Sequence, residues 1–195
     1  MACSHGCCPW KKYAPGSDPA VHADTARRHA AIPRMKTVLF VFCGMLVALV
    51  IAIQVGIFGG SRPADIGISN GRLKPPAPTR NSVSSQAALY PQHPQRAYAD
   101  IKPLPLQHGS ADGSLQALAA VLASMPGVRV VERRPDYLHA EAETRWMKFV
   151  DDLEFWANPA REVIELRSAS RLGREDFGVN RERIEAIRAA YLARP

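Results

Sequence analysis

The longest apolar stretch of the chain runs from Thr37 to Phe58 and holds no charged side chain over its 22 residues. An α-helix of that length spans about 33 Å, enough to cross the roughly 30 Å hydrocarbon core of a bilayer. A buried helix of a soluble domain has a polar face, and this stretch has none. The pattern therefore predicts one transmembrane helix. A cleaved signal peptide is the alternative, but its apolar region is only about 7–15 residues long, so an uncleaved anchor is favoured.

Positive charge around the apolar stretch predicts its orientation. Four basic residues closely precede the stretch and one follows it: Arg27, Arg28, Arg34, Lys36 and Arg62. The positive-inside rule places the N-terminus in the cytoplasm and residues 59–195 outside the cytoplasmic (inner) membrane, on the periplasmic side. Residues 1–36 show no periodicity and are predicted to be a disordered polar tail. The pair Met35-Lys36 lies directly before the apolar stretch, and Met35 is an alternative start of the chain.

Proline density separates the apolar stretch from a folded domain. Seven of the eight prolines within residues 59–112 lie from Pro75 onward: Pro75, Pro76, Pro78, Pro91, Pro94, Pro103 and Pro105. Such a segment cannot form a long helix or a central strand, because proline lacks the backbone N–H that both require. The composition predicts either extended chain lying over a domain surface or a tether from the bilayer.

Regular periodicity returns in residues 113–195. Apolar residues at helical spacing predict two helices, at 114–125 and 179–192. Apolar runs and alternation predict four strands, at 128–134, 137–144, 146–156 and 161–170. Short turns between the strands favour an antiparallel meander. The order predicts an α+β domain, a four-stranded antiparallel meander sheet flanked by two helices, preceded by one transmembrane helix.

Composition narrows the classes of function. The formal net charge is +7, but the six basic and two acidic residues of the segment 1–36 supply over half of this excess. The folded part is nearly balanced, so no nucleic-acid partner is predicted. Cys3, Cys7 and Cys8, with His5, fit no tetrahedral zinc pattern. No nucleotide fingerprint or nucleophile elbow occurs either, so the motifs predict no cofactor, no metal ion and no catalytic residue.

Basic and hydroxyl side chains gather where the fourth predicted strand is followed by the last helix. The members are Arg167, Ser168, Ser170, Arg171, Asn180, Arg181 and Arg183. Guanidinium groups and a helix N-terminus both favour anions, so this cluster predicts a site for an anionic ligand or a lipid head group. The alternative is a structural network with Asp151, Asp152 and Asp176. That alternative is favoured, because carboxylates are plentiful nearby.

A second polar constellation lies on the two central strands. His139 and Glu141 share one face of the second strand, and the third strand carries Asp151, Asp152 and Glu154. A four-residue loop over 158–161 would place Asp152 opposite Arg167. Asp151 has core-facing neighbours and needs a partner, for which Arg171, Arg181 and Arg183 are available. Such residues could bind a divalent metal or carry acid–base catalysis, but ordinary cross-strand pairing is favoured.

These patterns favour a non-enzymatic envelope protein, a binding or structural module for an anionic ligand, a lipid or a protein partner that the sequence does not identify. The alternative is a metal- or carboxylate-dependent envelope enzyme that would use His139 with Asp151, Asp152 and Glu154. Alanine substitutions at His139 and at Arg171 distinguish the two alternatives: loss of a bound metal in the first indicates the enzyme, and loss of anion or lipid binding in the second indicates the binding module.

Several segments resemble the domain-of-unknown-function 1499 family. In chain order they are Arg62–Gly67, Asn81–Gln86, Pro135–Glu141, Phe149–Phe155 and the run from Arg167 to Glu185, which together cover most of residues 62–190. The resemblance implies membership of a family whose activity is not established and whose bacterial members often carry an N-terminal membrane or signal segment. The family pattern has two cysteines where this chain has Pro76 and Ser82, which fits the loss of a disulfide pair.

Overall fold

The computed structural model describes residues 19–107 and 109–194. Its first helix, α1 (Pro19–Gln54), contains one segment, Arg34–Gln54, of 21 residues that is long and apolar enough to be a membrane span or a signal sequence. The helix begins at Pro19, inside the segment 1–36 that the sequence predicts to be a polar tail. The cluster of Cys3, His5, Cys7 and Cys8 lies outside the described residues.

The apolar helix ends earlier than its sequence pattern predicts. Gln54 is its last residue, four before Phe58. Gly56 adopts a φ of 78°, a left-handed conformation that glycine alone reaches without steric cost, and the short 3-10 helix η1 (Ile57–Gly59) follows it. The chain divides into two compact units at residues 49 and 50, and the second unit holds the folded domain.

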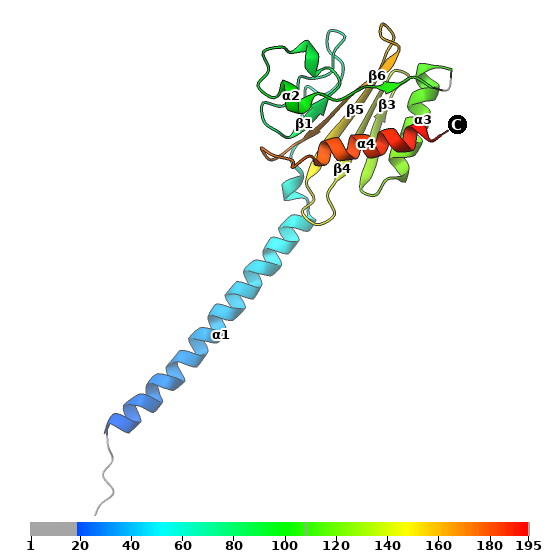
Figure 1. Cartoon of the computed structure of the whole chain (residues 1–195). Helices are drawn as coiled ribbons and strands as arrows, with labels where there is room; N and C mark the ends of the chain where they lie inside the picture. Colours follow the sequence, from blue (N-terminus) through cyan, green and yellow to red (C-terminus); the bar gives the residue numbers. More distant parts are fainter. Residues whose placement is uncertain (1–18, 108, 195) are drawn as a thin grey trace, which may run out of the picture. The chain divides into compact units, whose positions relative to one another are not determined.

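The folded domain is built on one antiparallel sheet, as predicted (Figure 1). Its strands lie in the order β1-β6-β5-β4-β3, and β2 also pairs with β6. The strands are β1 (Ser82–Ser84), β2 (Leu104–Pro105), β3 (Val128–Arg133), β4 (Tyr137–Glu143), β5 (Val150–Asn158) and β6 (Val163–Ser170). The predicted α+β class and the meander of β3 to β6 are confirmed. The predicted count of four strands is wrong, because the Pro-rich segment adds β1 and β2, which are too short to show periodicity.

Two helices cover one face of the sheet, α3 (Ala111–Ser124) and α4 (Val179–Leu192) (Figure 1). Ser110 caps α3 by accepting a hydrogen bond from the Gly113 N–H at 3.0 Å. Two short helices, η2 (Ala87–Leu89) and α2 (Arg96–Ala99), lie in the Pro-rich segment. An apolar core lies between the helices and the sheet, and its members include Leu115, Leu118, Leu138, Leu153, Phe155, Leu166, Ile184, Ile187 and Tyr191.

The opposite face of the sheet is covered by extended chain from the start of the Pro-rich segment, residues 63–78, which we call the strap. The Gly67 N–H donates to the Glu154 carboxylate at 2.7 Å, and Leu73 packs in a buried cluster with Tyr137 and Trp156. A covering strap of backbone brings N–H and C=O groups instead of apolar side chains. This face can therefore be both buried and polar, because the strap supplies hydrogen-bond partners to its side chains.

The central hairpins differ in register from the prediction. β5 begins at Val150 and not at Trp146, because the chain turns through Lys148 with a φ of 57°. The loop between β5 and β6 spans residues 159–162, since Asn158 pairs with Val163. Arg167 consequently lies opposite Glu154, and the predicted pairing of Arg167 with Asp152 is wrong.

Candidate functional site: buried charges beside a groove

The strap-covered face of the sheet carries a three-residue charge cluster at the end of β6. Arg171 donates to Asp152 from Nε at 2.9 Å and from Nη2 at 2.7 Å. The same Nη2 reaches a carboxylate oxygen of Glu141 at 2.5 Å. His139 Nε2 lies 2.9 Å from Asp152 Oδ1 on the neighbouring strand. Asp152 is therefore held by both Arg171 and His139. The two bonds from Arg171 to the carboxylate fix the plane of its guanidinium group.

A second cluster lies further along the same face, around Glu154. Arg167 Nη1 is 3.3 Å from the Glu154 carboxylate, and Arg167 Nε donates to the Pro75 carbonyl at 3.2 Å. The Tyr137 hydroxyl donates to the same carboxylate at 3.0 Å. The Glu154 side chain is fully buried and that of Arg167 is 5% exposed. The strap thus supplies backbone partners to both members of a buried ion pair.

These contacts shift ionisation on the strap-covered face. Burial would raise the pKa of Asp152, but hydrogen bonds from His139 and Arg171 outweigh it and lower that pKa to about 2. Hydrogen bonding to Asp152 and Glu141 raises the pKa of Arg171 above its ordinary value despite partial burial. Burial, with the neighbouring Glu154 carboxylate, raises the pKa of Tyr137. The Arg171 and Asp152 side chains are therefore a fixed pair of opposite charges at neutral pH.

The helix-covered side of the sheet holds a separate polar cluster centred on Asn180. Its amide Nδ2 donates to Asp176 at 2.7 Å and to Ser170 Oγ at 3.1 Å, and its Oδ1 accepts from the Ser168 hydroxyl. Asp151 is buried beside Arg183 at 2.7 Å, one of the three partners predicted for it. This network joins β5 and β6 to the first turn of α4.

The seven residues predicted as one anion site are divided by the sheet. Arg167 and Arg171 lie on the strap-covered side, while Ser168, Asn180 and Arg183 belong to the helix-covered network. Arg181 donates to two backbone carbonyls, Tyr98 at 2.6 Å and Asp100 at 2.8 Å. Neighbouring residues of a strand point to opposite faces, so the structure does not bring these seven side chains together.

The residues named for the alternative enzyme are divided in the same way. His139, Asp152 and Glu154 share the strap-covered face, but Asp151 lies on the other side with Arg183. Among residues 19–107 and 109–194, no three His, Cys, Asp or Glu side chains converge as ligands of a metal ion. The Nδ1 atom of His139 is buried and has no hydrogen-bond partner there.

A groove opens between the strap and the end of β6, and we call it the arginine groove. Its volume is about 390 Å³. Arg167 and Arg171 contribute its basic side chains from the sheet, and Lys74 contributes one from the strap. The full lining is Pro63, Asp65, Lys74, Pro75, Pro76, Ala77, Pro78, Asp152, Arg167, Ala169, Ser170 and Arg171.

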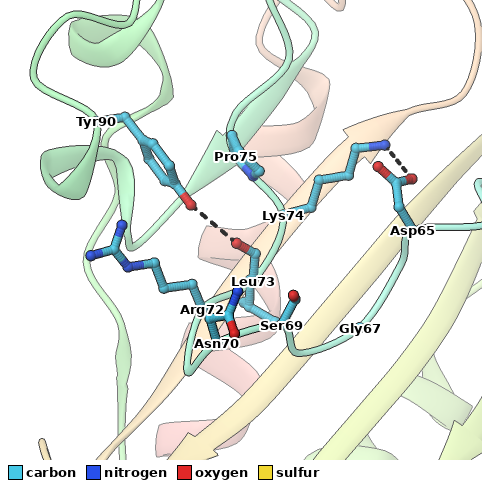
Figure 2. Close-up of a pocket in the computed structure, with 9 residues that line it drawn as sticks. All are labelled: Asp65, Gly67, Ser69, Asn70, Arg72, Leu73, Lys74, Pro75 and Tyr90. Carbon is cyan, nitrogen blue, oxygen red and sulfur yellow. Dashed lines mark hydrogen bonds and ion pairs between the residues drawn. The ribbon is translucent and has the colours of Figure 1, made fainter.

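A second hollow, the Lys74 pocket, adjoins the arginine groove and shares Asp65, Lys74 and Pro75 with it (Figure 2). Its volume is about 470 Å³, and its lining is Asp65, Gly67, Ser69, Asn70, Arg72, Leu73, Lys74, Pro75 and Tyr90. Figure 2 shows the Lys74 ammonium beside Asp65, at 2.6 Å, and the Tyr90 hydroxyl donating to the Leu73 carbonyl at 3.4 Å. Together the two linings hold four basic and two acidic side chains.

Sequence reasoning missed the strap's share of this site. Asp65, Arg72, Lys74 and Tyr90 come from the Pro-rich segment, where no periodicity shows which way a side chain points. One signal was present, since Arg72 and Lys74 are basic residues in an otherwise apolar and proline-rich run. Charges placed where a chain must stay extended are candidates for facing a partner or ligand.

Comparison with known proteins gives one match. A family model described as a protein of unknown function, DUF1499, matches residues 72–191, which is more than half of the chain. No curated protein and no solved structure matches the chain. The matched range contains every charged residue of the two clusters on the strap-covered face, as well as Arg72 and Lys74.

Proposed function

The chain belongs to the DUF1499 family of proteins of unknown function, and we propose that it is a membrane-anchored envelope protein that binds an anionic ligand in the arginine groove. The proposal has two parts, an anchor and a binding site. The anchor is the apolar segment Arg34–Gln54. The binding site uses the guanidinium groups of Arg167 and Arg171.

The main support for the binding site is that two arginines each keep a guanidinium N–H group that donates to no acceptor in the described part of the chain. Arg171 spends Nε and Nη2 on Asp152 and Glu141, and no described residue accepts from its Nη1. Arg167 spends Nε and Nη1, which leaves its Nη2. The side chains of Arg167 and Arg171 are 5% and 8% exposed, and both residues line the arginine groove.

Both arginines line the same groove, and their carboxylate partners hold them in place. A guanidinium that is already oriented loses little conformational entropy when it binds an anion. Lys74 and Arg72 add positive charge from the strap, so basic side chains outnumber acidic ones in the combined lining. A phosphate or carboxylate group fits these donors, because its oxygens accept the parallel N–H bonds of an arginine fork.

Inorganic phosphate at constant ionic strength is the first probe of this site. We expect phosphate to raise the unfolding temperature of the full chain in detergent, because a ligand that binds only the folded state stabilises it. Arg171→Lys keeps the charge and removes the planar fork, so phosphate affinity should fall roughly tenfold. Differential scanning fluorimetry and calorimetric titration measure both quantities.

Arg133→Lys is the matched control, because Arg133 is a partly exposed arginine paired with Asp112 and lies outside both hollows. Its phosphate affinity should equal that of the unmodified chain. Equal phosphate affinity in all three proteins would mean that phosphate binds outside the arginine groove. If phosphate stabilised none of them, the proposed anion site would be wrong. Glycerol phosphate in place of inorganic phosphate tests whether the site prefers a lipid head group.

Charge asymmetry supports an orientation with the domain outside the cytoplasm. Arg34 and Lys36 abut the N-terminal end of the apolar segment, whereas Arg62 is the first basic residue after it. A reporter enzyme that is active only outside the cytoplasm, fused after residue 195, should therefore be active. Activity of a cytoplasm-specific reporter at the same place would reverse the orientation. Removing Arg34 and Lys36 together should weaken the preference.

The alternative enzyme would rest on the contact between His139 and Asp152. Their side chains are 0% and 2% exposed, and His139 lines neither hollow, so a substrate in the groove would not reach the imidazole while the strap is in place. General acid–base catalysis needs hydrogen-bond reach to the substrate. The accessible guanidinium atoms favour binding over catalysis at this face. Retained phosphate binding in a folded His139→Ala variant would separate the two functions.

A further inference from the structure

The end of the domain formed by the β4–β5 and β6–α4 connections exposes a group of large apolar side chains, which we call the apolar rim. Its members are Trp146, Met147, Phe149, Leu172, Phe177 and Val179. Phe177 is 88% exposed and Trp146 is 73% exposed. Four of the six line a hollow of about 330 Å³. Trp146 and Met147 lie in the same β4–β5 connection as Phe149, which lines the hollow. Large apolar side chains that gather on a surface in this way mark an interaction site.

The backbone of the rim is built to point these side chains outward. Phe177 has a φ of 51°, a left-handed conformation that is uncommon for a bulky residue. The turn is held from below, because Asp176 accepts hydrogen bonds from the Gly178 N–H at 3.0 Å and from the Tyr98 hydroxyl. A strained turn that presents a phenylalanine to solvent needs a surrounding structure that imposes it.

The chain that follows the apolar helix is packed into the same end of the domain. Phe58 meets Phe149 edge to face, with ring centroids 6.1 Å apart. A Cβ at Gly59 would lie 3.5 Å from the Val150 side chain, so the backbone passes close to the start of β5. Phe58 is four positions after Gln54, a reach of at most about 14 Å. The residue that packs on Phe149 of the rim therefore lies within about 14 Å of the end of the apolar segment, and both belong to the same compact unit of the chain.

Charges of both signs surround the rim: Asp151, Glu175 and Asp176 line its hollow, and basic side chains accompany its tryptophan. The Arg145 guanidinium lies 5.1 Å from the centroid of the Trp146 ring. Lys148 and Arg174 flank the rim, and Lys148 pairs with Glu143 at 2.7 Å. Tryptophan and arginine together are typical of the membrane interface, where the ring lies at head-group level and the cation meets lipid phosphate.

We propose that the apolar rim inserts into the outer head-group layer of the membrane that the apolar helix crosses, so that the domain rests on that surface. The inference rests on the anchor of the proposed function and not on the anion site. Leu172 follows Arg171 directly, so the docked domain would hold the arginine groove near the lipid head groups. Apolar side chains in a docked rim would be shielded from water without a protein partner.

Fluorescence of the full chain in vesicles of phosphatidylethanolamine and phosphatidylglycerol tests the docking. The emission of Trp146 is isolated as the difference between the unmodified chain and Trp146→Phe. Acyl chains that carry bromine should lower this component roughly twofold, because the ring lies at the head-group boundary. Aqueous iodide should quench it weakly in vesicles.

Leu172→Ser and Leu192→Ser form a matched pair, because the two leucines are similarly exposed, at 44% and 47%, and only Leu172 belongs to the rim. Bromine quenching of Trp146 should fall in Leu172→Ser and remain in Leu192→Ser. Strong iodide quenching without bromine quenching would overturn the docking. Shielding from both quenchers together with cross-linked dimers would also overturn it, since a second copy would then cover the rim.

Extraction of the vesicles at alkaline pH separates this inference from the proposed anchor. A chain that resists extraction keeps its anchor, whatever the state of Trp146, so a failed quenching result then counts against the rim alone. Release of the chain into the supernatant would remove the anchor, and with it the basis for docking. The phosphate titration is independent of both results.

Discussion

Replacing Arg167 by methionine is expected to lower the free energy of unfolding by about 3–5 kcal/mol, because it leaves a buried carboxylate without its counter-charge. The Glu154 side chain is fully buried and lies 3.3 Å from Arg167. Methionine fills much of the space of the arginine stem, so the lost term is mainly charge. Urea unfolding of the full chain in detergent, followed by tryptophan fluorescence, measures the difference.

Two controls separate the buried charge from other effects of the substitution. Adding Glu154→Gln to Arg167→Met removes the orphaned charge and should recover most of the loss, since the Gly67 N–H and the Tyr137 hydroxyl can still donate to the amide oxygen. Arg133→Met breaks a partly exposed ion pair with Asp112 and should cost less than about 1 kcal/mol. If Arg167→Met costs no more than Arg133→Met, the pair at Glu154 contributes nothing to folding.

The strands and helices of the domain could be predicted because each buries a regular face. Leu153 and Phe155 alternate with polar neighbours on β5, and Ile184 and Ile187 repeat at helical spacing on α4. The register of the β5–β6 hairpin could not be predicted with equal certainty. Asn158 fits either the end of a strand or the start of a turn, and that single choice moves the partner of Arg167 from Asp152 to Glu154.

The candidate site was harder to predict, for two physical reasons. Alternation along β6 places Arg167 and Ser168 on opposite faces, so nearness in the sequence does not bring their side chains together. The groove itself depends on contacts between residues about 90 positions apart, such as Pro75 with Arg167. A proline-rich strap has no period of its own, so only the folded structure shows which face it covers.

The partner of Asp151 shows how much a burial argument can supply. Its neighbours on β5 face the core, so a buried carboxylate was expected there, and buried carboxylates require a cation. Arg183 meets this requirement at 2.7 Å from the first turn of α4. The sequence limited the partner to three arginines, and the position of the helix on the sheet selected one of them.

Acid is expected to weaken the fold through Asp152 as the pH falls from about 4 to about 2. The pKa of this carboxyl is 3.8 in the unfolded chain and about 2 in the folded domain. Between these values the unfolded state binds more protons, so the free energy of unfolding falls with falling pH. The contribution is complete above about pH 5 and amounts to about 2 kcal/mol, most of which is lost by pH 2.

Asp152→Asn isolates this contribution from that of the other carboxyls, such as Asp176, whose pKa is also lowered. The amide keeps the shape of the side chain but does not titrate, so the variant loses stability at neutral pH and has a flatter acid limb. The gap between the two urea-derived stability curves should narrow by about 2 kcal/mol from pH 5 to pH 2. Parallel curves would mean that Arg171 and His139 do not favour the ionised form of Asp152. The fixed pair of charges proposed for Arg171 and Asp152 beside the arginine groove would then be wrong.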